Sequence, residues 1–210
     1  MKIFKQIDIA LPVIVDALNG GQTLVYPTET CYGLGCDATN NSAVENIFAI
    51  KGRDAAKTVL MLALDVEMVK QFVLWDDFAD SIAKKYWPLS ISDNTPRPGL
   101  TLILPVKDRG GLASGVIGAD NTVAFRVTSY PFARSIVQTL GKPLVSTSAN
   151  VSGGANPYSI DSVVMSFANQ LVKPDLVIDA GILPERPPTT IARIENGTIK
   201  IIRQGELQLI

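Results

Sequence analysis

The sequence lacks histidine altogether, and this absence restricts its chemistry more than any other feature. Without an imidazole, the chain cannot use Ser-His-Asp or Cys-His catalysis, and it cannot bind a metal through histidine. Cysteine is nearly absent too, since Cys31 and Cys36 are the only two. They do not form a disulfide framework, and no second cluster completes a zinc site. If the chain is an enzyme, it works by another route.

The sequence also nearly lacks net charge, because 19 Lys and Arg residues stand against 20 Asp and Glu residues. A protein held to nucleic acid mainly by charge would be more basic, so we expect any such contact to be local or transient. No apolar run is long enough to span a membrane, and residues 1–9 lack the apolar segment of a signal peptide. We therefore expect a cytoplasmic protein. Its 210 residues suffice for one domain, 1–210.

Apolar patterns predict strands that alternate with helices along the chain. Expected strands occupy 23–26, 59–64, 100–104, 122–127, 144–147, 176–179, 190–194 and 198–203. Expected helices occupy 11–18, 78–86, 131–140 and 160–167, with two more that start at a cap at Asn41 or Ser42 and at Asp65. Asn196-Gly197 predicts a terminal hairpin. This order favours an α/β domain with a mixed sheet.

Polar residues cluster at the ends of the expected strands, where open α/β sheets commonly bind ligands. The clusters are Thr28–Thr30; Lys51, Arg53 and Lys57; Arg126; Ser146–Asn150; Thr189-Thr190; and Arg203. Five of these residues are cations although the whole chain is almost neutral, which suggests an anionic ligand such as a nucleotide. The alternative, that the cations are ordinary solvated residues, fits the spacing equally well.

Standard phosphate-binding motifs do not account for these clusters. The chain has no G-x-x-x-x-G-K-[ST] motif, and its G-x-G-x-x-A run, residues 33–38, does not directly follow a strand. We expect its glycines to permit a tight turn beneath the Thr28–Thr30 loop. The run Ser146–Asn150 fits either a helix cap or an anion cradle. Arg126 sits among apolar neighbours and needs a carboxylate, either from the protein or from a ligand.

Several motifs together resemble one known family. Tyr26–Gly35 reads YPTETCYGLG, Ile50–Arg53 contains a K-x-R element, and Ser148–Asn150 forms an S-x-N element. Val123–Val127 and Pro188–Thr190 follow in the same order. Each motif is short, but their order and spacing across nearly the whole chain are far more specific. The sequence resembles the YrdC-like threonylcarbamoyl-adenylate synthases (TsaC).

This resemblance implies a fold, a reaction and partners. The fold is a single-domain, twisted mixed α/β sheet around a large, positively lined cavity. The reaction converts L-threonine, bicarbonate and ATP, with Mg²⁺, into threonylcarbamoyl-adenylate and pyrophosphate. Transfer proteins of the TsaD and TsaB type then modify the adenosine beside the tRNA anticodon. We expect the contact with tRNA and these proteins to be transient, and no membrane is implied.

The resemblance also implies a role for each matching residue. The residues expected to carry catalysis are Lys51, Arg53, Ser148 and Asn150. Those expected to bind threonine are Thr30, Arg126, Ser146 and Thr189. Those expected around ATP are Arg53, Lys57, Thr122, Ser148, Asn156 and Arg203. No protein ligand to a metal is expected. Such a site suits a phosphoryl-type step in which positioning and charge neutralisation do most of the catalysis.

The chain departs from the family pattern in three places. About nine extra residues, Leu89–Arg97, separate Trp87-Pro88 from Pro98-Gly99 and are long enough to form a flap. The residues after the K-x-R element differ from the usual ones, which weakens the role assigned to Lys57. A threonine, Thr189, replaces the serine of the late P-S-T element. Because the sequence stops at Ile210, we expect no additional C-terminal domain.

Two other functions compete with the synthase. One is a non-catalytic double-stranded RNA- or tRNA-binding protein of the YciO type, against which the K-x-R and S-x-N elements and the low net charge argue. The other is a carbamoyl-adenylate module of hydrogenase-maturation carbamoyltransferases, which occurs within longer chains that contain zinc-binding parts. A shared fold alone does not decide between these functions.

Overall fold

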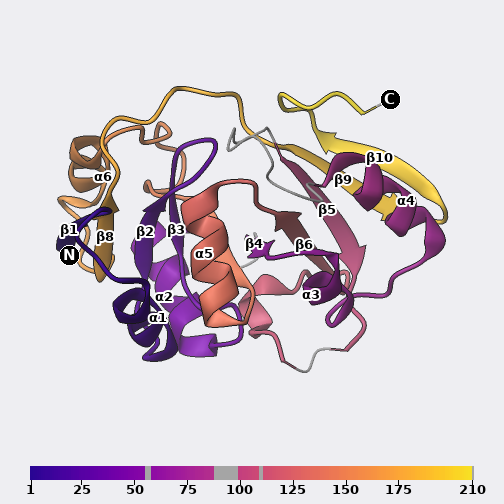
Figure 1. The fold of residues 1–210 in the computed structure, drawn as a ribbon, viewed down its shortest axis with the longest axis horizontal. Coiled ribbons are helices and arrows are strands. Elements are labelled where there is room, and N and C mark those ends of the chain that lie inside the picture. The colour runs from indigo at the N-terminus through magenta and orange to yellow at the C-terminus, as the bar shows by residue number, and fades with distance from the viewer. Residues whose placement is uncertain (55–57, 88–98, 109–110, 210) are drawn as a thin grey trace.

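A computed structural model describes residues 1–54, 58–87, 99–108 and 111–209. Within it, the strands form one twisted ten-stranded sheet in the order β1-β8-β2-β3-β7-β4-β6-β5-β9-β10 (Figure 1). The strands are β1 Lys2–Lys5, β2 Leu24–Pro27, β3 Tyr32–Gly35, β4 Leu60–Ala63, β5 Leu100–Pro105, β6 Thr122–Val127, β7 Leu144–Ser148, β8 Leu176–Asp179, β9 Thr190–Glu195 and β10 Thr198–Arg203. The expected mixed α/β sheet is confirmed. The boundary of a single domain at 1–210 stays a prediction.

The sheet mixes parallel and antiparallel neighbours. Parallel pairs are β1 with β8, β2 with β8, β4 with β6, and β5 with β9. The remaining pairs are antiparallel. Because β7 pairs with both β3 and β4, it joins the half of the sheet that contains β1, β8, β2 and β3 to the half that contains β4, β6, β5, β9 and β10.

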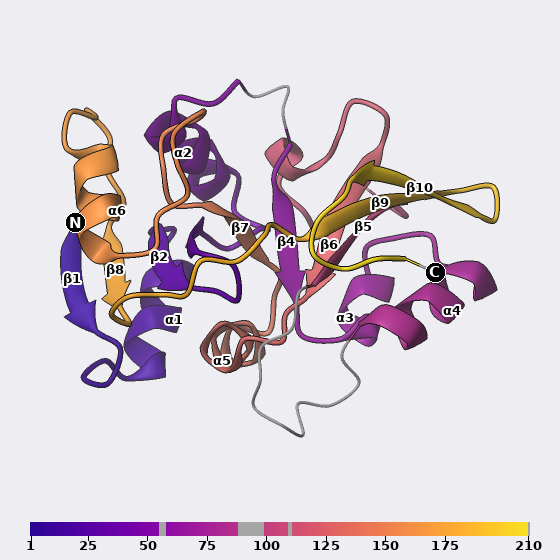
Figure 2. The same ribbon diagram turned by 90° about the horizontal axis from the view of Figure 1, so that it is seen from above.

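Helices cover both faces of the sheet (Figure 2). They are α1 Leu11–Asn19, α2 Asn41–Lys51, α3 Val66–Lys70, α4 Asp77–Tyr86, α5 Pro131–Leu140 and α6 Ile160–Phe167, with a short 3-10 turn at Ser114–Val116. On β2, Leu24 and Tyr26 pack with α1 and α5, whereas Val25 joins the core that contains α2 and α6. Successive strand residues face opposite sides, so a strand covered on both faces is apolar throughout.

Local signals place most of these elements. Asp65 accepts a hydrogen bond from the Met68 amide at the start of α3, as expected. The hairpin between β9 and β10 turns at Asn196 and Gly197, whose φ angles are 50° and 68°, the backbone that a two-residue type I′ turn requires. The cap of α2 is a correction, because Asn40 rather than Asn41 or Ser42 accepts from the Ala43 amide.

Two strands contradict the sequence-based expectation. Residues 32–35 form β3 rather than a tight turn, and the turn lies before them, at Thr28–Cys31. A methyl group on Gly35 would lie 2.1 Å from the Val145 carbonyl oxygen, so this glycine permits β3 and β7 to approach closely. Strand β1 was not expected, because its burial is slight and its pairing with β8 joins residues far apart in the chain.

Candidate functional site

The turn between β2 and β3 is closed by Thr28. Its hydroxyl donates to the Cys31 carbonyl at 2.7 Å and accepts from the amides of Thr30 and Cys31 at 3.2 and 3.4 Å. Hydroxyl side chains that bond to nearby backbone in this way fix a turn without further support. As a result, Thr30 is held at the rim of the central strands, 3.2 Å from the Thr28 hydroxyl.

A cavity of about 350 Å³ opens beside this turn. The neighbouring strands β3, β7, β4, β6, β5 and β9, the end of β10 and adjoining loops form its lining. The polar residues of this lining are Thr28, Thr30, Arg53, Thr58, Thr101, Arg126, Ser146, Thr147, Ser148, Asn156, Thr189 and Arg203. Its described lining contains three arginines and no carboxylate. Preorganised cations and hydroxyl groups of this kind favour an anionic ligand.

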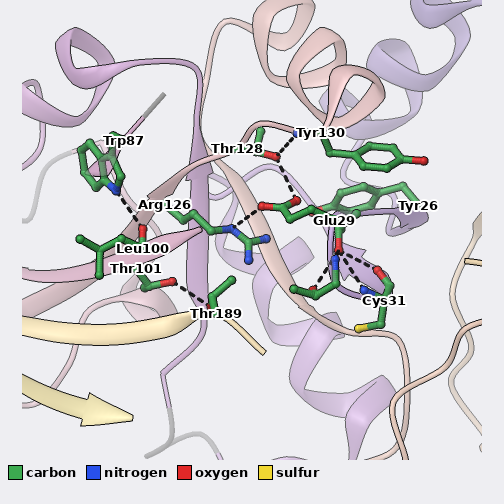
Figure 3. A network of polar contacts seen from close by, with 12 residues as sticks. Tyr26, Glu29, Cys31, Trp87, Leu100, Thr101, Arg126, Thr128, Tyr130 and Thr189 are labelled. Atoms are coloured by element: carbon green, nitrogen blue, oxygen red, sulfur yellow. Dashed lines mark hydrogen bonds and ion pairs between the residues drawn. The ribbon is translucent and has the colours of Figure 1, made fainter. Parts of the chain in front are cut away.

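Arg126 enters the cavity from β6, with only 4% of its side chain exposed. Its Nε lies 3.4 Å from Oε1 of Glu29, whose side chain is fully buried (Figure 3). The Glu29 Oε2 accepts a hydrogen bond from the Thr128 hydroxyl at 3.3 Å. The carboxylate that Arg126 needs is therefore supplied by the turn between β2 and β3.

Thr189 links two further residues of the cavity. The Arg203 guanidinium donates to the Thr189 carbonyl at 2.8 Å and to its hydroxyl at 3.2 Å. The hydroxyl groups of Thr101 and Thr189 lie 3.4 Å apart (Figure 3). Burial, followed by the charge of Arg126, lowers the pKa of Arg203. The cavity lining thus brings a second guanidinium close to Arg126.

A second cavity, of about 420 Å³, adjoins the first and shares Arg53, Ser148 and Asn156 with it. Lys51 lies in its wall at the end of α2 and is 2% exposed. Its Nζ donates to the carbonyls of Ser148 and Asn150 at 2.6 and 2.8 Å, and to Asn150 Oδ1 at 3.3 Å. All three ammonium donors therefore meet protein oxygens.

Asn150 completes this arrangement. Its Oδ1 accepts from the Ser148 hydroxyl at 2.6 Å, and its Nδ2 donates to the carbonyls of Gly154 and Ala155 at 2.5 and 3.0 Å. Burial, together with the charge of Arg53, lowers the pKa of Lys51 to about 8. The K-x-R and S-x-N elements are thus joined through Lys51, Ser148 and Asn150 into one hydrogen-bonded unit.

The structure brings together most of the residues predicted for the site. Eight line the first cavity: Thr30, Arg53, Arg126, Ser146, Ser148, Asn156, Thr189 and Arg203. Lys51 and Asn150 line the second. Thr122 lines neither described cavity, and its hydroxyl donates to Asp120 at 2.8 Å. Lys57 and the extra segment Leu89–Arg97 lie outside the described residues.

Sequence reasoning missed Thr101 and Glu29. Thr101 is fully buried on β5 and lines the first cavity, and a lone hydroxyl in an apolar strand is the only signal that marks it. Glu29 lies inside the motif that was recognised, but its pairing with Arg126 depends on contact between distant segments. Burial of a carboxylate in a turn is not visible in the sequence.

Acidic side chains are scarce around both cavities. In the described parts of their linings, Asp54 is the only carboxylate. Among the described residues, no group of three His, Cys, Asp or Glu that could hold a metal ion occurs. The described residues therefore offer no site that would hold a magnesium ion by protein ligands alone. Within the same residues, no helix is both long and apolar enough to cross a bilayer.

The fold and the site define a mixed α/β protein with a hydroxyl-lined cavity that contains three arginines. Comparison with known sequences then gives the family. The Sua5/YciO/YrdC family model, described as "Telomere recombination", matches residues 16–205. The threonylcarbamoyl-AMP synthase of Pseudoalteromonas atlantica is 33% identical over 186 residues, covering 89% of this chain and 92% of that protein. This chain belongs to the Sua5/YciO/YrdC family.

Other relatives agree with this assignment. The threonylcarbamoyl-AMP synthase of Methylococcus capsulatus is 36% identical over 143 residues, 68% of this chain and 72% of that protein. The structure of P. abyssi Sua5 in complex with L-threonine matches with a TM-score of 0.82 and 26% identity, covering 98% of this chain but 57% of that longer one. E. coli YciO, at 24% identity and a TM-score of 0.76, shares the fold.

Proposed function

We propose that this protein is a threonylcarbamoyl-AMP synthase, a transferase that acts in tRNA modification. The observation that carries the proposal is the convergence of Arg126, Arg53 and Arg203, with hydroxyl groups, on one cavity in a chain whose curated relatives bear this name. The Sua5 relative solved with L-threonine supports an amino-acid substrate. These relatives favour the synthase over a non-catalytic RNA-binding protein of the YciO type.

The proposed reaction has two chemical stages. The neutral amine of L-threonine first attacks bicarbonate, which forms a carbamate and releases water. A carbamate oxygen then attacks the α-phosphorus of ATP, the bond to the bridging oxygen breaks, and pyrophosphate leaves. The products are threonylcarbamoyl-AMP, pyrophosphate and water. Once the amine is neutral, positioning and charge stabilisation suffice for the second stage, so the absence of histidine is no obstacle.

Arg126 is proposed to bind the threonine carboxylate. Glu29 occupies the Nε side of its guanidinium, so the two terminal nitrogens are the part that a ligand in the cavity would meet. A guanidinium fork matches a carboxylate in two parallel hydrogen bonds. The hydroxyl groups of Thr30, Ser146 and Thr189 line the same cavity and are proposed to contact the rest of the amino acid.

The nucleotide is proposed to lie along the wall that the two cavities share. Arg53, Ser148 and Asn156 belong to both linings, and Arg203 lines the first. Lys51 and Asn150 would act by fixing Ser148, because their polar atoms already meet protein groups. The roles assigned to Thr122 and Lys57 stay predictions.

Other components of the reaction also stay predictions. Any Mg²⁺ would be bound mainly by ATP phosphate oxygens, as is usual for this ion in nucleotide sites. Contact with tRNA and transfer by TsaD- and TsaB-type proteins follow from the reaction product, which is too reactive to serve as an end product. A cytoplasmic location fits this role.

Pyrophosphate release from ATP and bicarbonate, with and without L-threonine, tests the proposal. We expect threonine-dependent release by the wild type and a loss of about 100-fold to 1,000-fold in Arg126→Ala, which corresponds to about 2.7–4 kcal/mol of lost stabilisation. Arg126→Lys keeps a positive charge beside Glu29, so a loss of activity in this variant can be measured without leaving that buried carboxylate unpaired. Arg134→Ala is the matched control, because Arg134 lies on α5 and donates to the Leu64 carbonyl. A wild type that releases no pyrophosphate would contradict the proposal, and RNA binding should then be measured.

A further inference from the structure

Glu29 is a buried carboxylate that lies behind the cavity rather than in its lining. It belongs to the turn between β2 and β3, and no part of its side chain is exposed. One carboxylate oxygen faces Arg126 Nε at 3.4 Å, and the other accepts from Thr128 at 3.3 Å (Figure 3). The Thr128 hydroxyl in turn accepts from the Tyr130 amide at 3.2 Å. A substrate in the cavity therefore meets Arg126 and not Glu29.

The contact between Glu29 and Arg126 is close but is not a completed hydrogen bond. Among the described residues, neither Glu29 Oε1 nor Arg126 Nε has a hydrogen-bond partner, although both atoms are buried. Native structures rarely leave such atoms unpaired. A small rotation of the guanidinium about its stem would close the bond and would also turn the terminal nitrogens.

The stem of Arg126 has little other freedom. A methyl group added at Gly99 would lie 2.7 Å from Arg126 Cδ, so the backbone of this glycine packs directly on the stem. With the stem fixed, the remaining freedom is the orientation of the guanidinium plane, and Glu29 is the charged group placed to set it. Arg-carboxylate recognition depends strongly on that orientation.

Charge gives Glu29 a second effect on the cavity. Arg203 lies near enough for the Arg126 charge to lower its pKa, after the larger effect of burial. Without Glu29, two guanidinium groups would face the same end of a cavity whose described lining holds no carboxylate. With Glu29 in place, the two guanidinium groups and this carboxylate together carry one net positive charge, which suits a ligand that brings a single carboxylate.

We propose that Glu29 is a positioning residue for the amino-acid substrate: its carboxylate orients the Arg126 guanidinium so that the terminal nitrogens receive the substrate carboxylate. This inference rests on the proposed function. It concerns the amino-acid end of the cavity, so removal of the Glu29 charge affects threonine and leaves the nucleotide largely unaffected.

Steady-state kinetics of Glu29→Gln separate these effects. We expect the KM for L-threonine to rise at least about tenfold and the KM for ATP to stay within about twofold, because the amide keeps the shape but not the charge. The control Glu67→Gln removes an exposed carboxylate of α3 that pairs with Lys70, and both KM values should be unchanged. A parallel rise in both KM values, with a lower melting temperature, would show a structural role only and would overturn the proposal.

A double-mutant cycle shows whether Glu29 acts through Arg126. In the Arg126→Lys background, Glu29→Gln should change the threonine KM by less than about threefold, because the group that it orients is already lost. Independent, additive effects would overturn the proposal. If Glu29→Gln does not fold, Thr128→Val removes the hydroxyl that donates to Glu29 and accepts from the Tyr130 amide, and it should raise the threonine KM alone by about threefold.

The outcomes distinguish this inference from the function beneath it. If the wild type shows no threonine-dependent pyrophosphate release, the proposed function is wrong. If the wild type is active but the threonine KM of Glu29→Gln is unchanged, the inference about Glu29 is wrong and the proposed function is unaffected.

Discussion

The two cavities differ in how the protein holds the cation in each wall. Arg126 is balanced by one carboxylate on its Nε side, and its remaining nitrogens face the first cavity. Lys51 has no donor left for a ligand, since its ammonium donates to three oxygens of Ser148 and Asn150. The first arrangement leaves hydrogen-bonding capacity for a ligand, whereas the second uses that capacity inside the protein. This difference supports the proposal that Arg126 contacts substrate and that Lys51 positions the groups that do.

Among the changes that compare the two cavities, Lys51→Met has the largest expected effect. This change leaves three oxygens without their donor, so we expect the free energy of unfolding to fall by about 2 kcal/mol and kcat/KM to fall about 100-fold. Urea denaturation and pyrophosphate release measure the two quantities. Lys84→Met is the control, because Lys84 is exposed and pairs with Asp80 on the surface of α4. Lost activity with unchanged stability would contradict the positioning role of Lys51, since it would place Lys51 in direct contact with substrate.

A pH titration should give an effect of intermediate size. The pKa of Lys51 is lowered to about 8, so its charge is present below that pH and is lost as the pH rises through it. ATP is an anion and favours the charged form, so we expect ATP affinity to weaken about tenfold between pH 7 and pH 9.5. Calorimetry of ATP binding at constant ionic strength checks this change.

The control for the titration is Lys51→Met, in which the ATP affinity should show no inflection near pH 8. An equal inflection in that variant would assign the titration to another group. An ATP affinity that rises with pH would contradict the expected direction.

The smallest expected effect concerns Thr101, which sequence reasoning missed. Its hydroxyl lies 3.4 Å from that of Thr189, a long contact between two neutral groups. Thr101→Val keeps the shape of the side chain, so we expect the threonine KM to rise about threefold and the free energy of unfolding to change by less than about 1 kcal/mol. Kinetics with threonine and then with ATP as the varied substrate check it. A tenfold rise in the threonine KM would instead indicate that Thr101 contacts the substrate directly.

Much of the fold could be predicted because its signals are local. A continuous apolar run marked β4, and Asn196-Gly197 marked the hairpin of β9 and β10. Strand β3 could not be predicted in the same way. Its glycines favour a turn in isolation, and the close approach of the Val145 carbonyl to Gly35, which explains a glycine in this strand, comes from a distant segment.

The candidate site was predictable in its members but not in its arrangement. The motifs identified Arg126, Lys51 and Asn150 because these residues stand in short, ordered patterns along the chain. The contact of Glu29 with Arg126 and that of Lys51 with Asn150 each join segments about 100 residues apart. No spacing rule reaches across such distances, so which cation faces the cavity and which is used internally could not be read from the pattern.

The α/β class, most helix and strand positions, the family and the exclusion of histidine chemistry could all be derived from the amino-acid sequence. These properties depend on residue types and short-range periodicity. Three further features depend on how distant segments pack: β1 joins the sheet through β8, Glu29 lies behind Arg126, and the ammonium of Lys51 is saturated by protein oxygens. Such pairings form when distant segments pack together, where burial and unmet hydrogen bonds select one partner among many.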